Sequence, residues 1–130
     1  MIVVPDTNVL VAALVAKGLC TEVVLHCIRQ RSLVSSARLL GELDRTLQRK
    51  FEVTPAVAKF LELFRSDIRI VEPVVLAEPV CRDSDDDVVL ATALAAGADL
   101  VLTGDQDLLV LRAYEGIAIM TPRQYLEQFI

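Results

Sequence analysis

Acidic side chains occur at three separate places in this 130-residue sequence, each beside an apolar run. Asp6 follows IVVP near the start of the chain, the segment RDSDDD carries four aspartates, and LTGDQDL carries Asp105 and Asp107. Carboxylates that lie close together repel unless a cation lies between them. Oxygen ligands without a nearby histidine or thiolate are typical of a hard cation, so the three groups together predict a Mg²⁺ or Mn²⁺ site.

Each acidic group also has a purely structural interpretation, and these alternatives stay open. Asp6 and Asn8 could cap the helix that VLVAALVA begins, and the RDSDDD aspartates could cap the next helix and interact with its dipole. The TGDQD segment could be an ordinary turn. A helix cap needs only one acceptor, however, so three acidic elements together favour the cation site.

Short apolar runs alternate with longer segments of helical period, and this alternation predicts the fold. The runs are IVV at 2–4, LVS at 33–35, IRIV at 68–71, LVLT at 100–103 and GIAIM at 116–120. Strands that alternate with helices form a mainly parallel sheet with helices on both faces. We therefore expect an α/β protein with one domain over residues 1–130, folded as a three-layer α/β/α sandwich. Functional crevices of such sheets lie beyond the carboxyl ends of the strands, where Asp6, Asp105 and Asp107 follow theirs.

Capping residues mark where the helices begin. Thr54-Pro55 and Thr121-Pro122 each place a hydroxyl before a proline at the first helical position. A leucine stripe indicates a helix that begins near Ser36. The segment Val88 to Ala96 is apolar nearly all round and ends at Gly97, so it predicts a buried helix that follows RDSDDD.

Glu42 is a further acidic candidate. On the helix that begins near Ser36, it lies at the border of the leucine stripe. Its polar side carries Arg38, Arg45 and Arg49. Surface ion pairs would explain these residues without any function. If the amino end of this helix faces the carboxyl edge of the sheet, Glu42 can reach the acids and the arginines can meet a phosphate backbone.

The charge distribution is more informative than the net charge of −5, which by itself argues against a nucleic-acid binder. Residues 29–69 hold nine basic and five acidic side chains, whereas residues 82–130 hold nine acidic and three basic ones. One part of the chain can therefore attract phosphate, while the other concentrates carboxylates.

Cysteine usage and hydropathy concern the compartment. The three cysteines, Cys20, Cys27 and Cys81, are odd in number and lack CxxC spacing, so we expect buried free thiols in a reducing compartment. No apolar run approaches the roughly 18 residues that span a bilayer. We expect a cytoplasmic protein without membrane contact.

The motifs together resemble the PIN-domain ribonucleases, and among them the VapC-like toxins of type II toxin–antitoxin systems. The matching segments are VVPDTNVLVAAL, GELDRTL, CRDSDDDVVLATALAAGADLVLTGDQDLL and MTPRQYLEQF. The resemblance implies an acidic pocket for one or two Mg²⁺ or Mn²⁺ ions and hydrolysis of RNA phosphodiester bonds to 5′-phosphate and 3′-hydroxyl ends. It also implies a small antitoxin partner and a homodimer.

The same resemblance assigns roles to individual residues. The implied catalytic and metal-binding residues are Asp6, Glu42, Asp86 and Asp105, with Asp107 as a further metal ligand. The implied supporting residues are Asn8, Thr103, Asp83 and Asp87. Asp86 is preferred to its acidic neighbours because it lies eleven residues before Gly97, in phase with the family's helix-opening aspartate. The predicted RNA-binding residues are Arg38, Arg45 and Arg49.

Two other classes of protein would also explain acidic side chains at strand ends. A phosphoacceptor domain of the haloacid-dehalogenase or receiver kind also places acids at strand ends. The dehalogenase-like pattern needs an aspartate where Asn8 stands, and a receiver needs a late lysine, which residues 99–122 lack. A PIN-like module that binds RNA or protein without cutting is the main alternative to a nuclease.

His26, the only histidine, has no catalytic partner in the sequence and is expected to be structural or at the surface.

Overall fold

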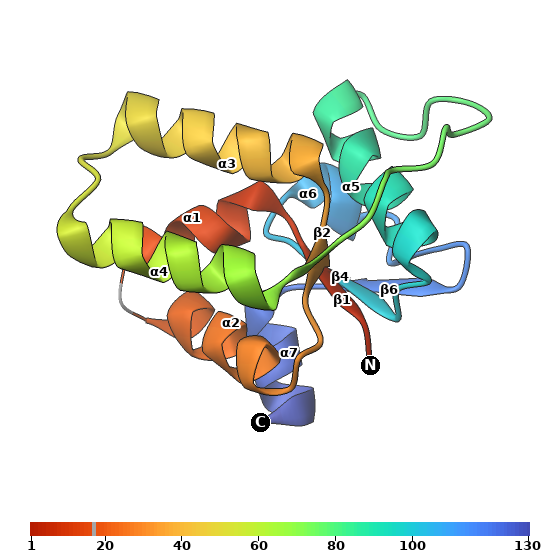
Figure 1. Ribbon diagram of the computed structural model, residues 1–130. Helices are drawn as coiled ribbons and strands as arrows, with labels where there is room; N and C mark the ends of the chain where they lie inside the picture. The colour runs from red at the N-terminus through yellow and green to blue at the C-terminus, as the bar shows by residue number, and fades with distance from the viewer. Residues whose placement is uncertain (17) are drawn as a thin grey trace.

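A mainly parallel sheet forms the centre of the computed structural model, which describes residues 1–16 and 18–130 (Figure 1). Its strands, in spatial order, are β1 (Val3–Pro5), β4 (Leu100–Leu102), β6 (Ile117–Met120) and β5 (Ala113–Tyr114). The first three are parallel, and β5 is antiparallel to β6. A second parallel pair, β2 (Val34–Ser35) and β3 (Arg69–Ile70), lies next to β1 through a backbone bridge between Leu33 and Val3.

Helices cover both faces of this sheet (Figure 1). One face carries α1 (Thr7–Val15), α2 (Leu19–Arg29), α4 (Pro55–Asp67) and α7 (Pro122–Phe129). The other carries α5 (Ser84–Ala96) and α6 (Gln106–Leu109). The helix α3 (Ala37–Lys50) contributes to the hydrophobic core on each face of the sheet, with Leu39 on the α5 side and Leu40, Leu43 and Leu47 on the α1 side. The prediction of a three-layer α/β/α sandwich is confirmed.

The central strands β1 and β4 are apolar throughout because both of their faces are buried. Val3 and Leu100 face one helical layer, whereas Val4 and Val101 face the other. Strands covered on both sides read as continuous apolar runs rather than as alternating patterns. Pro5, which has no N–H, ends β1, and the next bond to β4 runs from the Asp6 N–H to the Leu102 carbonyl at 2.8 Å.

The helices begin at the capping residues that the sequence indicates. Side-chain oxygens of Ser36, Thr54 and Thr121 accept backbone N–H groups at the starts of α3, α4 and α7. The side chain of Gln124 accepts the Thr121 N–H at 2.8 Å, which completes a capping box. Gly97, with a φ of 62°, ends α5 in the left-handed region that favours glycine.

The start of α5 differs from the prediction. The apolar part of the helix begins at Val88, but the helix itself begins at Ser84, within the RDSDDD run. Asp83 caps it, because its Oδ1 accepts the Asp85 N–H at 2.9 Å. Acidic residues in a first helical turn interact favourably with the helix dipole. Asp86 is therefore part of the helix rather than of the segment before it.

Neither the three thiols nor the histidine belong to the group of three aspartates, although Cys81 lies beside Asp87. The three cysteines are free, and Cys27 is buried while Cys20 and Cys81 are partly exposed. His26 Nδ1 lies 2.9 Å from the hydroxyl of the buried Tyr125, a structural contact between α2 and α7.

Among the described residues, no single helix is long and apolar enough to cross a membrane, although α1 and α2 together reach that length and composition across a bend of 108°.

Candidate metal centre at the carboxyl edge of the sheet

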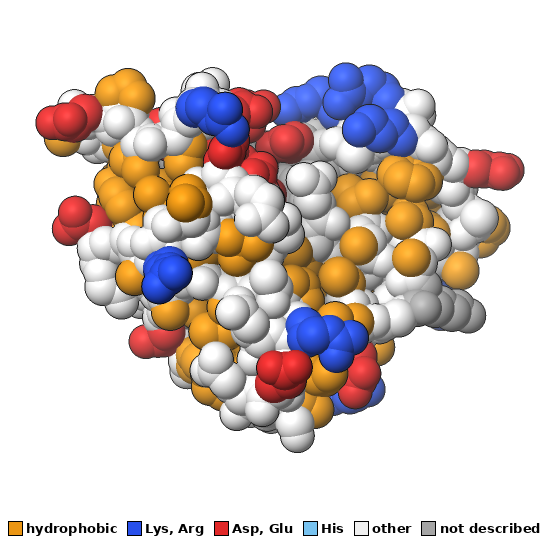
Figure 2. All heavy atoms as spheres, turned by 180° about the vertical axis from the view of Figure 1, so that it is seen from behind, with side chains coloured by type: hydrophobic (Ala, Val, Ile, Leu, Met, Phe, Trp, Pro, Cys, Tyr) orange, Lys and Arg blue, Asp and Glu red, His pale blue; other side chains and the backbone are white. Residues whose placement is uncertain are grey.

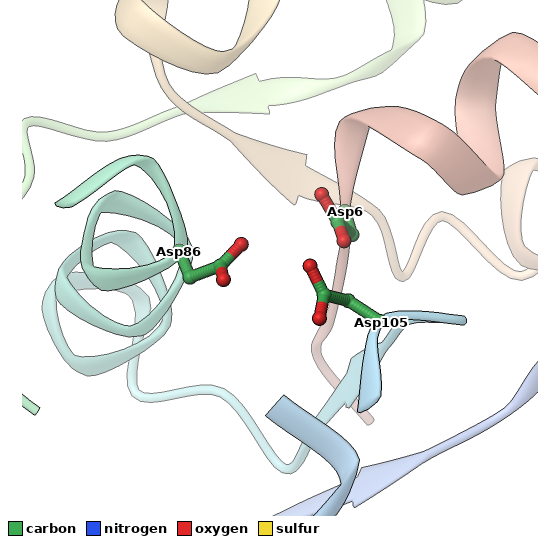
Figure 3. Close-up of side chains that lie close together, drawn as sticks. All are labelled: Asp6, Asp86 and Asp105. Carbon is green, nitrogen blue, oxygen red and sulfur yellow. The ribbon is translucent and has the colours of Figure 1, made fainter. Parts of the chain in front are cut away.

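Three aspartates from three elements meet at the carboxyl edge of the central sheet. Asp6 lies between β1 and α1, Asp86 lies in the first turn of α5, and Asp105 follows β4 and precedes α6. Each offers one carboxylate oxygen, and these oxygens lie within 4.8 Å of one another. Figure 3 shows the three side chains pointing toward a common space. Because β1 and β4 are neighbouring parallel strands, the residues that follow them share one edge.

Asp6 uses its carboxylate for the site rather than for capping. It occupies the N-cap position of α1 but makes no capping hydrogen bond with its side chain. Instead, its Oδ2 accepts the hydroxyl of Thr103 at 2.8 Å, and Thr103 Oγ1 accepts the Asp105 N–H at 3.0 Å. Burial raises the pKa of Asp6, and the bond from Thr103 lowers it. The nearby backbone N–H groups of Thr7 and Asn8 also lower it, while repulsion from Asp105 raises it. One buried threonine thus links two of the three aspartates.

Asp86 is the acid most affected by its surroundings. Removal from water, followed by repulsion from Asp105 and Asp6, raises its pKa from 3.8 to about 7. Near neutral pH, the three carboxylates therefore resist being charged together. A divalent cation between them would favour the ionised form of Asp86.

The donor set fits a hard cation. All three ligand atoms are carboxylate oxygens, and no histidine or cysteine joins the group within the described part of the chain. The hydroxyl of Thr7, next to Asp6, is buried without a hydrogen-bond partner among the described residues, so it is available to water or to a ligand. Few carboxylates with room for water suit Mg²⁺ or Mn²⁺.

Glu42 faces the site from α3 but lies outside the group of three. Its side chain is half-buried. Burial and then repulsion from Asp85 and Asp6 raise its pKa, while Arg45 lowers it. The negative charges of these aspartates therefore act on the Glu42 carboxylate from across the space between α3 and α5.

Three other predicted aspartates have partners of their own. Asp83 caps α5, as described above. Asp87 accepts the backbone N–H groups of residues 80–81 at 3.2 and 2.8 Å and so ties the segment before α5 to the helix. Asp107 Oδ1 accepts a hydrogen bond from Arg82 Nη2 at 2.6 Å. The structure does not bring these three carboxylates into the group formed by Asp6, Asp86 and Asp105.

The remaining predicted residues lie at the surface. Asn8 is exposed in the first turn of α1. The exposed side chains of α3 include Arg38, Arg45 and Arg49. Figure 2 shows Lys and Arg side chains gathered over α3 beside a group of acidic side chains. Arg82, the partner of Asp107, is the only basic residue between positions 70 and 111, and no sequence motif singles it out.

The fold and site together define an α/β protein with an aspartate cluster at the carboxyl edge of a mainly parallel sheet. The family model of the PIN domain matches residues 2–107, and the chain belongs to the PIN-domain family. PIN domains are generally nucleases that act on RNA and typically use a divalent metal. A comparison with curated protein sequences found no match to this chain.

Proposed function

We propose that this protein is a Mg²⁺- or Mn²⁺-dependent endoribonuclease. The observation that carries the proposal is the group of three carboxylates, whose ligand atoms lie within 4.8 Å of one another. Asp6, Asp86 and Asp105 would hold the first cation, and Glu42 on α3 would help to hold a second one or accept a proton. When bound, the cation supplies Lewis-acid chemistry, because it lowers the pKa of water and offsets negative charge on the phosphate.

The side chains around the cation site prepare it for this chemistry. The Thr103 hydroxyl donates to Asp6 and fixes the direction of that carboxylate. Glu42, whose pKa is raised by burial, is suited to accept a proton from the attacking water. Asp107 and Asn8 lie near the first residues of their helices and would act on water or on substrate rather than replace the three aspartates. Asp83 and Asp87 support the site by holding the start of α5.

RNA would approach along α3. Arg38, Arg45 and Arg49 are exposed on this helix, and the described structure records no ion pair for any of them. Guanidinium groups bind phosphate oxygens without reading the base sequence. The arginines would therefore hold the RNA backbone while the aspartates act on one phosphodiester bond.

The biological setting follows from the resemblance of the motifs. On that ground we propose that the chain is a single PIN domain over residues 1–130 and the toxin component of a toxin–antitoxin pair. Its partners would be a small antitoxin protein and a second copy of the chain, in the cytoplasm. A short neighbouring gene that encodes the antitoxin would support this setting.

Cleavage of RNA by the purified protein tests the proposed activity. We expect cutting in Mg²⁺ or Mn²⁺, products with 5′-phosphate ends, and complete loss of cutting with a chelator. Asp6→Asn should abolish cleavage while the protein stays folded, because the amide keeps the size of the side chain but not its charge. Cleavage by Asp6→Asn at the wild-type rate would reject the assigned site. Metal binding without cleavage of any RNA would instead favour a silent RNA- or protein-binding module.

A further inference from the structure

Arg82 lies beside the three-aspartate group, next to Asp107 and within the influence of Asp105. It immediately precedes the cap of α5, and its guanidinium pairs with the carboxylate of Asp107 in α6. The pair therefore joins the helix that carries Asp86 to the turn that carries Asp105. The Arg82 side chain is 87% exposed and that of Asp107 is 33% exposed.

The ion pair has little value as a structural element. Exposed ion pairs contribute little to folding because water and salt screen them and two long side chains lose freedom. The same screening makes the pair easy to exchange for another anion. Hydrogen bonding and charge from Asp107, with a further contribution from Asp105, raise the pKa of Arg82, so this side chain already lies within the electric field of the acidic site.

The surrounding charges show why a positively charged side chain at this position matters. Residues 70–111 contain nine acidic residues and one basic residue, which is Arg82. The arginines of α3 come from a different helix, and Arg38 at its start lines a pocket with Ser84 and Asp87 of α5. In Figure 2, Lys and Arg side chains lie on both sides of the acidic group at the top of the molecule. An RNA backbone held only from α3 would meet uncompensated negative charge on the α5 and α6 side.

We infer that Arg82 binds a phosphate of the RNA backbone next to the scissile one, from the α5 and α6 side of the site. Asp107 holds the guanidinium there when no RNA is bound. The planar guanidinium fork matches carboxylate and phosphate oxygens equally well, so RNA replaces Asp107 as its acceptor. This inference rests on the proposed function and extends it to a second element that holds the substrate.

RNA binding as a function of salt tests the inference. Binding of a short fluorescein-labelled single-stranded RNA is measured in a chelator, so that nothing is cut, for wild type, Arg82→Gln, Asp107→Asn and the double variant. Loss of one phosphate contact should flatten the slope of log affinity against log salt by about 0.7 in Arg82→Gln. Asp107→Asn should raise the affinity in the wild-type background more than in the Arg82→Gln background, because it releases Arg82.

A matched control separates a local contact from a change in total charge. Arg29→Gln removes one exposed arginine at the end of α2, beside the start of β2 and thus at the opposite edge of the sheet. It should leave the slope unchanged, and Arg82→Lys should restore most of the lost slope.

Two results would overturn the inference. One is an Arg82→Gln slope equal to that of Arg29→Gln. The other is a loss of Mn²⁺ affinity in Arg82→Gln with an unchanged RNA slope, which would mean that Arg82 only positions α5 against α6. Either result leaves the proposed nuclease function standing if the wild-type protein cuts RNA. Absence of cleavage by wild type would reject the nuclease while the binding experiment still reports on Arg82.

Discussion

At the scale of single residues, Asp86 shows how strongly the three carboxylates act on one another. Its pKa in the folded protein is about 7, compared with an ordinary value of 3.8, because it is buried beside Asp105 and Asp6. A carboxyl group with a raised pKa favours the folded state while it is protonated. This contribution is fully present below the unfolded-state pKa and is lost as the pH rises through the folded-state value.

The first prediction concerns the stability of the metal-free protein. In a chelator, the free energy of unfolding should decline between about pH 4 and about pH 7 as Asp86 is forced to ionise. Asp86→Asn removes this charge, so it should be more stable than wild type at about pH 8 and lose that advantage toward about pH 4. Urea unfolding of both proteins across this range measures the difference.

Added Mn²⁺ provides the control for this experiment. The cation should raise the stability of wild type at high pH and have little effect on Asp86→Asn, because the variant lacks one of the three ligands. A difference in unfolding free energy between wild type and Asp86→Asn that does not change with pH would contradict the raised pKa of Asp86.

At the scale of elements, the segment before α5 decides which acid of RDSDDD faces the site. Val74 N–H bonds to the Ala91 carbonyl at 3.2 Å, and the backbone of residues 80–81 bonds to Asp87, so both ends of this segment are attached to α5. Asp87 is thereby committed to the segment, and Asp86, one residue earlier in the same turn, faces the other aspartates. Neighbouring acids of the same type thus have different roles.

Substitutions at these neighbouring positions should separate the two roles. Asp87→Ala removes the acceptor of two backbone N–H groups, so it should cost about 1.5–3 kcal/mol of stability and leave Mn²⁺ affinity nearly unchanged. Asp86→Ala should have the reverse effect, with metal affinity lost and stability in a chelator not lowered. Calorimetric Mn²⁺ titration and urea unfolding measure both quantities, and a loss of metal affinity in Asp87→Ala would reassign the ligand.

At the scale of the whole molecule, charge is separated between opposing elements. The basic side chains of α3 lie beside the acidic site that α5 and the start of α6 help to form, although the chain as a whole carries a net charge of −5. Binding of RNA by an acidic protein is therefore a matter of local field rather than of total charge. The metal and the arginines would act in sequence, since the cation reduces the repulsion that phosphate otherwise meets.

Removal of the α3 arginines should change RNA binding without changing the metal site. We expect the triple variant Arg38→Gln, Arg45→Gln, Arg49→Gln to flatten the salt dependence of single-stranded RNA binding by about 2, at about 0.7 for each lost phosphate contact. Its Mn²⁺ affinity should stay within the range of wild type. Fluorescence anisotropy at several salt concentrations gives the slope, with Arg29→Gln as the control, and an unchanged slope would place the RNA elsewhere.

Much of the architecture can be predicted from local signals. Buried strands require continuous apolar runs, and helix starts require oxygen acceptors at residues such as Ser36, Thr54 and Thr121, so both leave a mark on nearby sequence. β5 has no such mark because Ala113–Tyr114 belongs to no apolar run, and the four-residue α6 is too short to show a helical period. The sequence also predicts that Asp6 and Asp105 share an edge, since each follows a parallel strand.

Sequence alone determined the layer order, the edge on which acids gather and the hard-cation chemistry of their oxygens, because these depend on residue type and on spacing along the chain. Only the tertiary structure decided which hydrogen bonds and ion pairs each aspartate makes. That choice depends on where α5 begins and on contacts between distant residues, such as Thr103 with Asp6 and Arg82 with Asp107. Such contacts form only when the packed layers bring separate segments together, and nothing in the local pattern encodes them.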